Sequence, residues 1–327
     1  MPIRFLSEIE RSIKVRESLL KKFEKEKTDC YRLFNGTGEG VPGLIIDRYR
    51  EVLIFQWHEG KCHLAASELE SLAAVYGKEI GIQSVYLKSF VTDRSSQSAD
   101  ATHYLSQPLW GKESPAEIIC HENGMKLAIR PYEGFSTGIF LDQRNNRSFL
   151  RKHFHGREVL NCFSYTCAFS VACALNGNKV TSVDLSKRYL DWGKNNFNLN
   201  GIVIGDHFFY SVDVFLQFKR AKKLQKTYDL IILDPPSFSR NSEGKTFSVK
   251  KDMKSLITGS CELLNPNGVL FISSNLTLWN SPLLQRYVAE VLVEMKMNVE
   301  WIKLPIIPDD FLGCESPLSA CCFKRLD

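Results

Sequence analysis

From residue 158 onward, apolar runs typical of strands alternate with segments that have the spacing of helices. Strands that alternate with helices form mostly parallel sheets covered on both faces. The sequence therefore predicts a doubly wound α/β domain. The expected strands are 158–164, 179–185, 207–212, 228–236, 268–275 and 319–325, and the expected helices are 141–153, 166–176, 186–200, 213–223 and 248–265.

The preceding residues follow another pattern, with several short apolar runs and dense turns. Asn123-Gly124 favours a two-residue turn, so a hairpin is expected over 116–131. Residues 92–114, which include Ser95, Ser96, Gln97 and Ser98, are expected to form a surface loop that is either simply mobile, the favoured alternative, or in contact with substrate. We predict an α+β domain over 1–115 and a second domain over 116–327. In the first domain, helices are expected over 3–27 and 64–77, the latter ending at Gly77, and strands over 30–34, 43–49, 51–57 and 84–90.

Composition excludes several classes of protein. Hydrophobic residues make up 44% and charged residues 24%, as in ordinary globular chains. No run of about 18 apolar residues occurs, and the charged N-terminal segment lacks the apolar core of a signal peptide, so a cytoplasmic protein without a membrane partner is expected. The net charge, 42 − 37 = +5, permits a polyanionic partner. The ten cysteines show no zinc-type spacing, and no metal is expected.

Polar residues gather where the predicted parallel strands end, which is where doubly wound sheets bind ligands. The first of these strands runs into Asn161-Cys162-Phe163-Ser164-Tyr165-Thr166. The span 161–169 contains no glycine, and glycine is what allows a backbone to approach a pyrophosphate closely. This loop argues against NAD or FAD and suits a ligand without phosphates.

Two acidic residues follow the next strands. Asp184 stands 23 positions after Asn161, a spacing that suits a carboxylate accepting hydrogen bonds from a ribose. Asp213 would suit an adenine amino group. Either residue could instead cap the helix that follows it, and for Asp213 this alternative carries equal weight.

The most specific motif is Asp234-Pro235-Pro236-Ser237-Phe238. Two prolines directly after an apolar strand stop the sheet and stiffen the turn. The acidic side chain and the turn carbonyls could then hold acceptors in place, while Phe238 could stack on a flat base. A purely structural turn is the weaker alternative.

Together these motifs resemble the class I S-adenosylmethionine-dependent methyltransferases, and more closely the ribosomal large-subunit RNA methyltransferases. The resemblance is carried by TGIFLDQRNNR (137–147), the stretch 159–201 and LDPPSFSR (233–240), with YRLFNGTGEGVPGLIIDRY (31–49) similar to the β-rich domain that precedes the catalytic one. It implies a Rossmann-like class I methyltransferase domain preceded by a smaller α+β domain, S-adenosylmethionine as cofactor and ribosomal RNA as substrate.

The resemblance also implies roles for individual residues. Asp184 would hold the ribose and Asp213 the adenine amino group, while Gln143 and Arg144 would line the pocket mouth, with Arg144 facing the methionine carboxylate. The methionine part would be cradled by Asn161, Phe163, Ser164, Tyr165 and Thr166, and the target base by Asp234, Pro235, Pro236, Ser237 and Phe238.

Two branches of these enzymes differ in chemistry. The 5-methylcytosine branch shares the domain order but needs a cysteine thiolate after the strand 268–275, where this chain has Ser273-Ser274-Asn275. The guanine-N7 half of the bifunctional large-subunit enzyme is similar in having Asn-type residues there and an LDxR-type helix start, here Leu141 to Arg144. We therefore predict methylation of guanine N7 in 23S ribosomal RNA. A cytosine-C5 enzyme and a non-catalytic RNA-binding protein remain alternatives.

Some features depart from the family pattern. Cys167 stands where family members often have glycine, and no PUA-type RNA-binding module is recognisable. RNA targeting is then expected to fall to residues 1–115 and to basic surfaces. One such surface is the run 219–223, although those cations would equally complement a helix C-terminus. A homodimer is left open.

Overall fold

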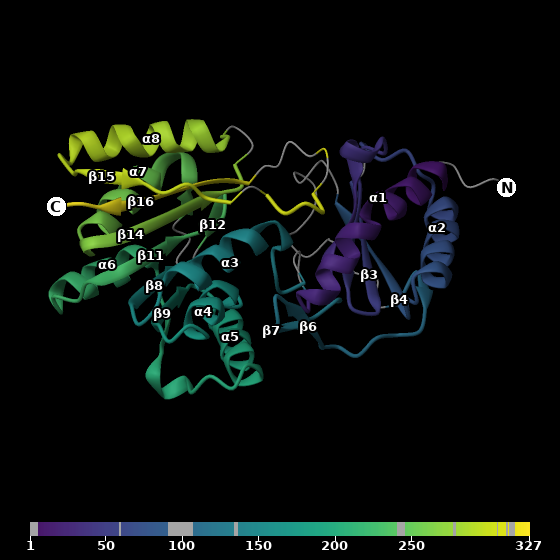
Figure 1. The fold of residues 1–327 in the computed structure, drawn as a ribbon, viewed down its shortest axis with the longest axis horizontal. Helices are drawn as coiled ribbons and strands as arrows, with labels where there is room; N and C mark the ends of the chain where they lie inside the picture. Colours follow the sequence, from purple (N-terminus) through teal and green to yellow (C-terminus); the bar gives the residue numbers. More distant parts are fainter. Residues whose placement is uncertain are drawn as a thin grey trace. The chain divides into compact units, whose positions relative to one another are not determined.

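The computed structural model describes residues 6–58, 60–90, 107–133, 137–240, 246–276, 279–305, 307–311, 313 and 318–327. Two compact units are present (Figure 1). The first comprises residues 1–144 together with 308–315, and the second comprises 145–307 together with 316–327. Ser95, Ser96, Gln97 and Ser98 of the predicted loop lie outside the described residues.

The first unit is built on a five-stranded sheet in the order β1-β2-β3-β4-β5. Neighbouring strands are antiparallel except β3 and β4, which are parallel and joined through α2. Its elements are α1 (Leu6–Lys25), β1 (Cys30–Asn35), β2 (Leu44–Tyr49), β3 (Val52–His58), α2 (Ala66–Glu79), β4 (Ser84–Phe90), β5 (Trp110–Gly111), β6 (Ile118–Glu122) and β7 (Met125–Ile129), with short 3-10 turns at Gly36–Glu39 and Leu141–Gln143.

The helix α2 does not end at Gly77 as predicted but continues to Glu79. A Cβ atom added at Gly77 would overlap the ring of Trp110. Glycine at this position therefore lets β5 pack against the helix, and it does not mark the helix end.

The β6–β7 hairpin forms around Asn123-Gly124, as the sequence predicts. Both residues have positive φ, 49° and 75°, which a type I′ turn requires. The hairpin is tied to β1 and its flanking residues. The backbone nitrogen of Asp29 donates to the carbonyl of His121 at 2.9 Å. In return, the backbone nitrogen of His121 donates to Asp29 Oδ1 at 2.6 Å. The boundary between the two compact units accordingly falls after Arg144, whereas the predicted domain boundary follows residue 115.

The second unit is a seven-stranded sheet in the order β10-β9-β8-β11-β14-β16-β15. Strands β8, β9, β10, β11 and β14 are parallel, and β16 is antiparallel to both of its neighbours. The chain reverses its strand order between β8 and β11, the switch point of a doubly wound sheet. The strands are β8 (Glu158–Cys162), β9 (Lys179–Asp184), β10 (Phe208–Ser211), β11 (Tyr228–Leu233), β14 (Leu264–Ser274), β15 (Val299–Trp301) and β16 (Ser319–Arg325), with a short ribbon of β12 (Phe238–Arg240) and β13 (Thr246–Ser248).

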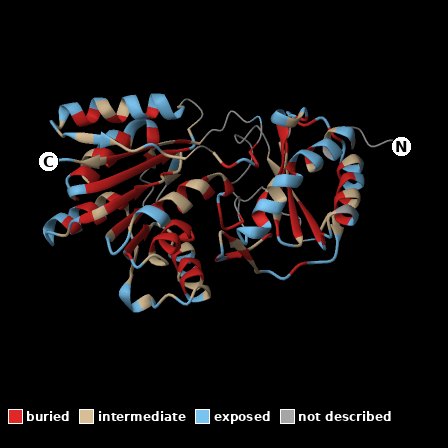
Figure 2. Cartoon of the chain, viewed as in Figure 1, coloured by how far each residue is buried: buried red, intermediate tan, exposed pale blue. Residues whose placement is uncertain are grey.

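Helices cover both faces of this sheet, and the buried strands run between them (Figure 2). Because side chains alternate along a strand, Leu160 faces one layer and Val159 the other. The first layer contains α6 (Val214–Lys223), α7 (Val249–Cys261) and α8 (Ser281–Glu294), and the second contains α3 (Arg144–His153) and α4 (Ala168–Ala174), with α5 (Lys187–Leu199) beside α4 and β9.

The sequence analysis left out α8, although its signal is present. Asn280 caps the helix, Pro282 stands in the first turn, and buried residues recur at helical spacing. Within the described part of the chain, no helix is long and apolar enough to cross a membrane.

Candidate active site

The loop that follows β8 has an unusual backbone. Phe163, Tyr165 and Cys167 have φ values of 58°, 49° and 63°, although none of them is glycine. Residues held in this left-handed region cost about 1–3 kcal/mol each and cluster at functional sites. The loop lies at the switch point of the sheet, so the strain falls where doubly wound folds bind ligands.

Asp184, at the end of β9, holds this loop in place. Its Oδ2 accepts a hydrogen bond from the backbone nitrogen of Tyr165 at 2.9 Å, and its Oδ1 accepts one from Ser186 at 2.9 Å. Burial raises the pKa of this carboxyl group, and the two backbone donors partly offset the rise. A carboxylate buried at a cost in this position, with further lone pairs on each oxygen, suits a ligand that donates hydrogen bonds.

Cys167 fits its site because of a glycine on another helix. A Cβ added at Gly193 of α5 would lie 2.8 Å from the Cβ of Cys167 and closer still to its Sγ. The side chain of Cys167 thus occupies the space that Gly193 leaves. This pairing explains how the loop accommodates a cysteine side chain at position 167.

Other predicted loop residues serve as supports for the loop. The side-chain amide of Asn161 donates to Ser170 Oγ at 2.8 Å. The hydroxyl groups of Ser170 and Ser182 in turn share a hydrogen bond of 2.8 Å. The carbonyl of Thr166 accepts a hydrogen bond from Asn196 at 2.8 Å. Ser170, Ser182 and Asn196 went unnoticed in the sequence because their partners lie on separate elements.

Two more predicted residues lie within this loop. Ser164 Oγ donates to the carbonyl of Val183 at 3.0 Å. The ring of Tyr165 packs edge-on against Tyr189, with centroids 4.5 Å apart.

Asp213 caps the helix α6, the alternative noted from the sequence. Its Oδ1 accepts from the backbone nitrogens of Phe215 and Leu216 at 2.9 and 3.3 Å. The residue follows β10, whose end lies beside the end of β9 in the sheet. Capping of α6 is enough to explain an aspartate at position 213 without a ligand. A contact of Asp213 with adenine stays a prediction.

The Asp-Pro-Pro motif is bound to the end of β14. Ser273 Oγ donates to Asp234 Oδ1 at 2.6 Å, and Ser237 Oγ donates to Asn275 Oδ1 at 2.7 Å. Pro235 and Pro236 end β11, and Phe238 follows with 58% of its side chain exposed. The turn is thereby fixed at both ends while an aromatic ring is presented to solvent.

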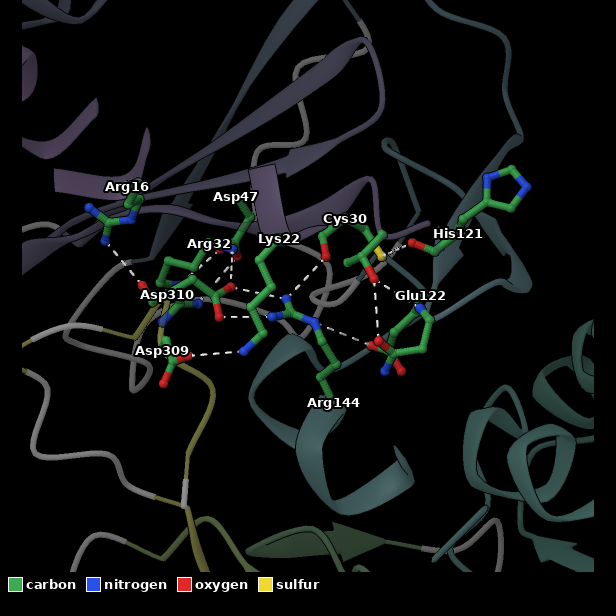
Figure 3. A network of polar contacts seen from close by, with 12 residues as sticks. Arg16, Lys22, Cys30, Arg32, Asp47, His121, Glu122, Arg144, Asp309 and Asp310 are labelled. Carbon is green, nitrogen blue, oxygen red and sulfur yellow. Dashed lines mark hydrogen bonds and ion pairs between the residues drawn. The ribbon is translucent and has the colours of Figure 1, made fainter. Parts of the chain in front are cut away.

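Gln143 and Arg144 belong to the first unit and are buried there. The Arg144 guanidinium donates to both oxygens of Asp310, at 2.8 and 3.0 Å, and to the carbonyl of Cys30 (Figure 3). Burial alone would lower the pKa of Arg144, but Asp310 and Glu122 raise it. Asp310, which the sequence analysis did not consider, is thus the counter-charge of Arg144. The expected contact of Arg144 with the methionine carboxylate and the expected place of Gln143 at the pocket mouth stay predictions.

Comparison with known proteins decides the family. A family model described as S-adenosylmethionine-dependent methyltransferase matches residues 90–316. The chain belongs to this methyltransferase family. It therefore has the class I methyltransferase fold, is a transferase that uses S-adenosylmethionine, and is not a non-catalytic binding protein.

Individual relatives of this methyltransferase cover most of its length. YwbD of Bacillus subtilis is 35% identical over 309 residues, which are 94% of this chain and 75% of YwbD. Ribosomal RNA large subunit methyltransferase I of Escherichia coli K12 is 31% identical over 282 residues, 86% of this chain and 69% of that one. A crystal structure of SMU.776 complexed with SAH has a TM-score of 0.84 and 30% identity, covering 99% of this chain and 82% of that one.

The loop and strand ends of the methyltransferase suit the cofactor. The backbone nitrogens of Ser164, Tyr165 and Cys167 donate hydrogen bonds within the protein, so the shape of the loop is fixed without a glycine-rich phosphate cradle. Asp184 supplies a carboxylate beside that loop, as a ribose requires.

Proposed function

We propose that this methyltransferase modifies a guanine of large-subunit ribosomal RNA at N7 by direct transfer. The observation that supports the proposal is the structure at the end of β14. Ser273 and Asn275 bind the Asp-Pro-Pro turn, and Ser274 Oγ accepts a hydrogen bond from the backbone nitrogen of Leu276 at 3.2 Å. All three positions are occupied by hydrogen-bonding groups where a cytosine-C5 enzyme would need a thiolate.

The described cysteines give no substitute nucleophile. All nine are buried. Burial raises the pKa of Cys167, Cys261 and Cys321 to about 12, so these thiols are protonated at neutral pH. A thiol that is both buried and protonated does not attack a base. Cys314 lies outside the described residues.

Guanine N7 requires less of the protein than cytosine C5 does. Its lone pair lies in the plane of the ring, so methylation needs no covalent adduct and no prior loss of a proton. S-adenosylmethionine supplies a methyl group on cationic sulfur. The residues of the chain must hold the base in line and exclude water. Phe238 offers a stacking surface, and Asp234 offers negative charge near a base that becomes cationic.

Support for the RNA substrate comes from relatives. The Escherichia coli relative carries ribosomal RNA large subunit in its name, and the family match extends over most of the chain. Cytoplasmic localisation and a homodimer stay predictions.

Nucleoside mass mapping tests the proposal. Naked ribosomal RNA and large-subunit particles from a deletion strain are each incubated with the purified chain and S-adenosylmethionine, and the RNA is then digested and mapped. We expect one new 7-methylguanosine in the large-subunit RNA. A 5-methylcytidine would overturn the choice of base, and no methylation of naked RNA or of large-subunit particles would overturn the RNA substrate.

A trapping experiment separates the two mechanisms directly. RNA that contains 5-fluorocytosine forms a covalent complex only with an enzyme that attacks through a thiolate. We expect no complex that survives denaturing gel electrophoresis. If one forms, C314S shows whether the residue outside the described part is responsible, with C261S as the matched buried control.

A further inference from the structure

Two aromatic rings stand on the outer strand of the second unit's sheet. Phe208 and Tyr210 lie on β10, which pairs with β9 on one side and with no described strand on the other. The ring planes are parallel to within 7°, with centroids 6.2 Å apart. Both side chains are half-buried, and neither belongs to the core that α6, α7 and α8 form on this face. Their packing in the fold therefore does not fully account for two large rings here.

Three cations lie over these rings. The Arg220 guanidinium carbon is 4.6 Å from the centroid of Tyr210, and the Nζ atoms of Lys226 and Lys179 are 4.7 and 5.3 Å from that of Phe208. These distances are within the range of cation–π attraction. We name Lys179, Phe208, Tyr210, Arg220 and Lys226 the β10 edge surface.

The charge of this surface is only partly neutralised. Glu158 lies 4.0 Å from Lys179 and 3.8 Å from Lys226, so one carboxylate serves two lysines. Lys219 and Lys223, on the last turns of the same helix as Arg220, are exposed and form no ion pair with the described residues. Within the run 219–223, Arg220 lies over Tyr210 and Lys222 pairs with Glu262, so the positive charge of the run is only partly neutralised.

We infer that the β10 edge surface binds a single-stranded segment of the substrate RNA. Aromatic rings that stack on bases, combined with cations that meet phosphates, are the chemistry that holds single strands without sequence preference. A second copy of the chain fits less well, because pairing two such edges would bring like charges together.

The surface runs along the sheet toward the active site, from Lys179 at the start of β9 to Tyr210 near the end of β10. Tyr210 pairs with Val183, the residue before Asp184. From β10 to β11, which carries the Asp-Pro-Pro turn, there are three strand spacings, or about 14 Å, across the sheet. Along β9, Lys179 lies five residues, or about 16 Å, before Asp184, so an RNA chain of several nucleotides spans the two. This inference rests on the proposed function, since it takes RNA as the substrate.

The test measures binding of a fluorescent oligoadenylate of about ten nucleotides to the full-length chain at several salt concentrations. Y210L removes a ring and keeps apolar bulk, so affinity should fall roughly tenfold with an unchanged salt dependence. R220Q should reduce the slope of log affinity against log salt by about 0.7, because one phosphate contact is lost.

The matched control is K194Q. Lys194 lies 5.7 Å from the ring of Phe209, which points to the opposite face of β10, and it pairs with Asp191. We expect K194Q to bind the oligonucleotide like the wild type, and all three variants to bind S-adenosylmethionine normally. Equal losses of oligonucleotide affinity in K194Q and R220Q, or no loss of affinity in Y210L, would overturn the inference that the β10 edge surface binds RNA.

Two further outcomes keep this inference separate from the proposed function. If ribosomal RNA is methylated but Y210L and R220Q leave its KM unchanged, the surface is wrong and the function stands. If the wild type methylates no RNA, the function fails whatever the oligonucleotide does. If sedimentation shows a dimer that Y210L dissociates while RNA binding is unaffected, the edge binds a second copy and the inference is wrong.

Discussion

At the scale of single residues, Asp184 carries the most weight in the site. It accepts a hydrogen bond from the backbone nitrogen of Tyr165 in the strained loop, and its carboxylate lies at the end of β9, where the cofactor is expected to bind. In D184N one oxygen remains to accept a backbone hydrogen bond, so the chain should fold. The charge that a ribose diol would contact is lost, and we expect affinity for S-adenosylmethionine to fall about tenfold to a hundredfold, measured by calorimetry.

The control for this variant is D213N. Asparagine is as good a helix cap as aspartate, so α6 should persist. Affinity close to that of the wild type would show that Asp213 acts as a cap only. A loss comparable to that of D184N would instead support its predicted contact with adenine, and an unchanged affinity in D184N would refute the ribose assignment.

The raised pKa of Asp184 has a consequence for stability. Because burial raises the pKa above 3.8, the folded chain holds this proton more tightly than the unfolded chain does. The contribution of Asp184 to the free energy of unfolding should therefore decrease as the pH rises from 3.8 through the raised pKa. Urea unfolding at a series of pH values should show this decrease in the wild type relative to D184N. A difference independent of pH would argue against it.

At the scale of elements, two glycines determine how helices pack. In G193A the new methyl group would collide with Cys167, so we expect a loss of about 1–3 kcal/mol in the free energy of unfolding and weaker cofactor binding. C167G removes the obstacle and accepts the positive φ, so the double variant G193A/C167G should recover most of the loss. Urea unfolding of the three variants measures this coupling, and simple additivity would disprove it.

Gly77 allows a similar test in the first unit. Alanine is favoured over glycine inside a helix by about 1 kcal/mol, so helix propensity alone predicts that G77A stabilises the chain. The ring of Trp110 occupies the space, and we expect destabilisation instead. W110A should lose its own packing but abolish the penalty of G77A. Thermal unfolding of the four proteins decides between propensity and packing.

These elements also show how far sequence reasoning extends. Most strands and helices followed from hydrophobic spacing, although α8 and β15 were left out, and the turns at Asn123-Gly124 and Pro235-Pro236 followed from local chemistry. The pairing of Cys167 with Gly193 could not be predicted, because it joins two helices whose contact depends on the fold. Gly77 was misread because a glycine near the end of a helical pattern looks the same whether it ends the helix or makes room for a neighbour.

At the scale of the whole molecule, the chain returns to its first unit near its end. Asp310 is fully buried there, where its carboxylate binds Arg144 and the backbone nitrogen of Arg32 at 2.8 Å, and its carbonyl accepts from Arg16 at 3.0 Å. Spacing in the sequence gives no sign of this network, because its members are separated by up to 294 positions (Figure 3). The first unit is therefore completed by residues 308–315, which lie far along the sequence from the rest of that unit.

A comparison of Asp310 with its neighbour Asp309 tests how much the segment 308–315 contributes to the stability of the first unit. D310N leaves the buried Arg144 without its full counter-charge, so the free energy of unfolding should fall by about 3–5 kcal/mol. D309N removes an equal charge from an ion pair with Lys22 whose side chains are about half exposed, and should cost about 1 kcal/mol or less. Urea unfolding compares the two, with S-adenosylmethionine affinity as a measure of the second unit. Equal losses would mean that net charge, and not the buried carboxylate, determines the stability of the first unit.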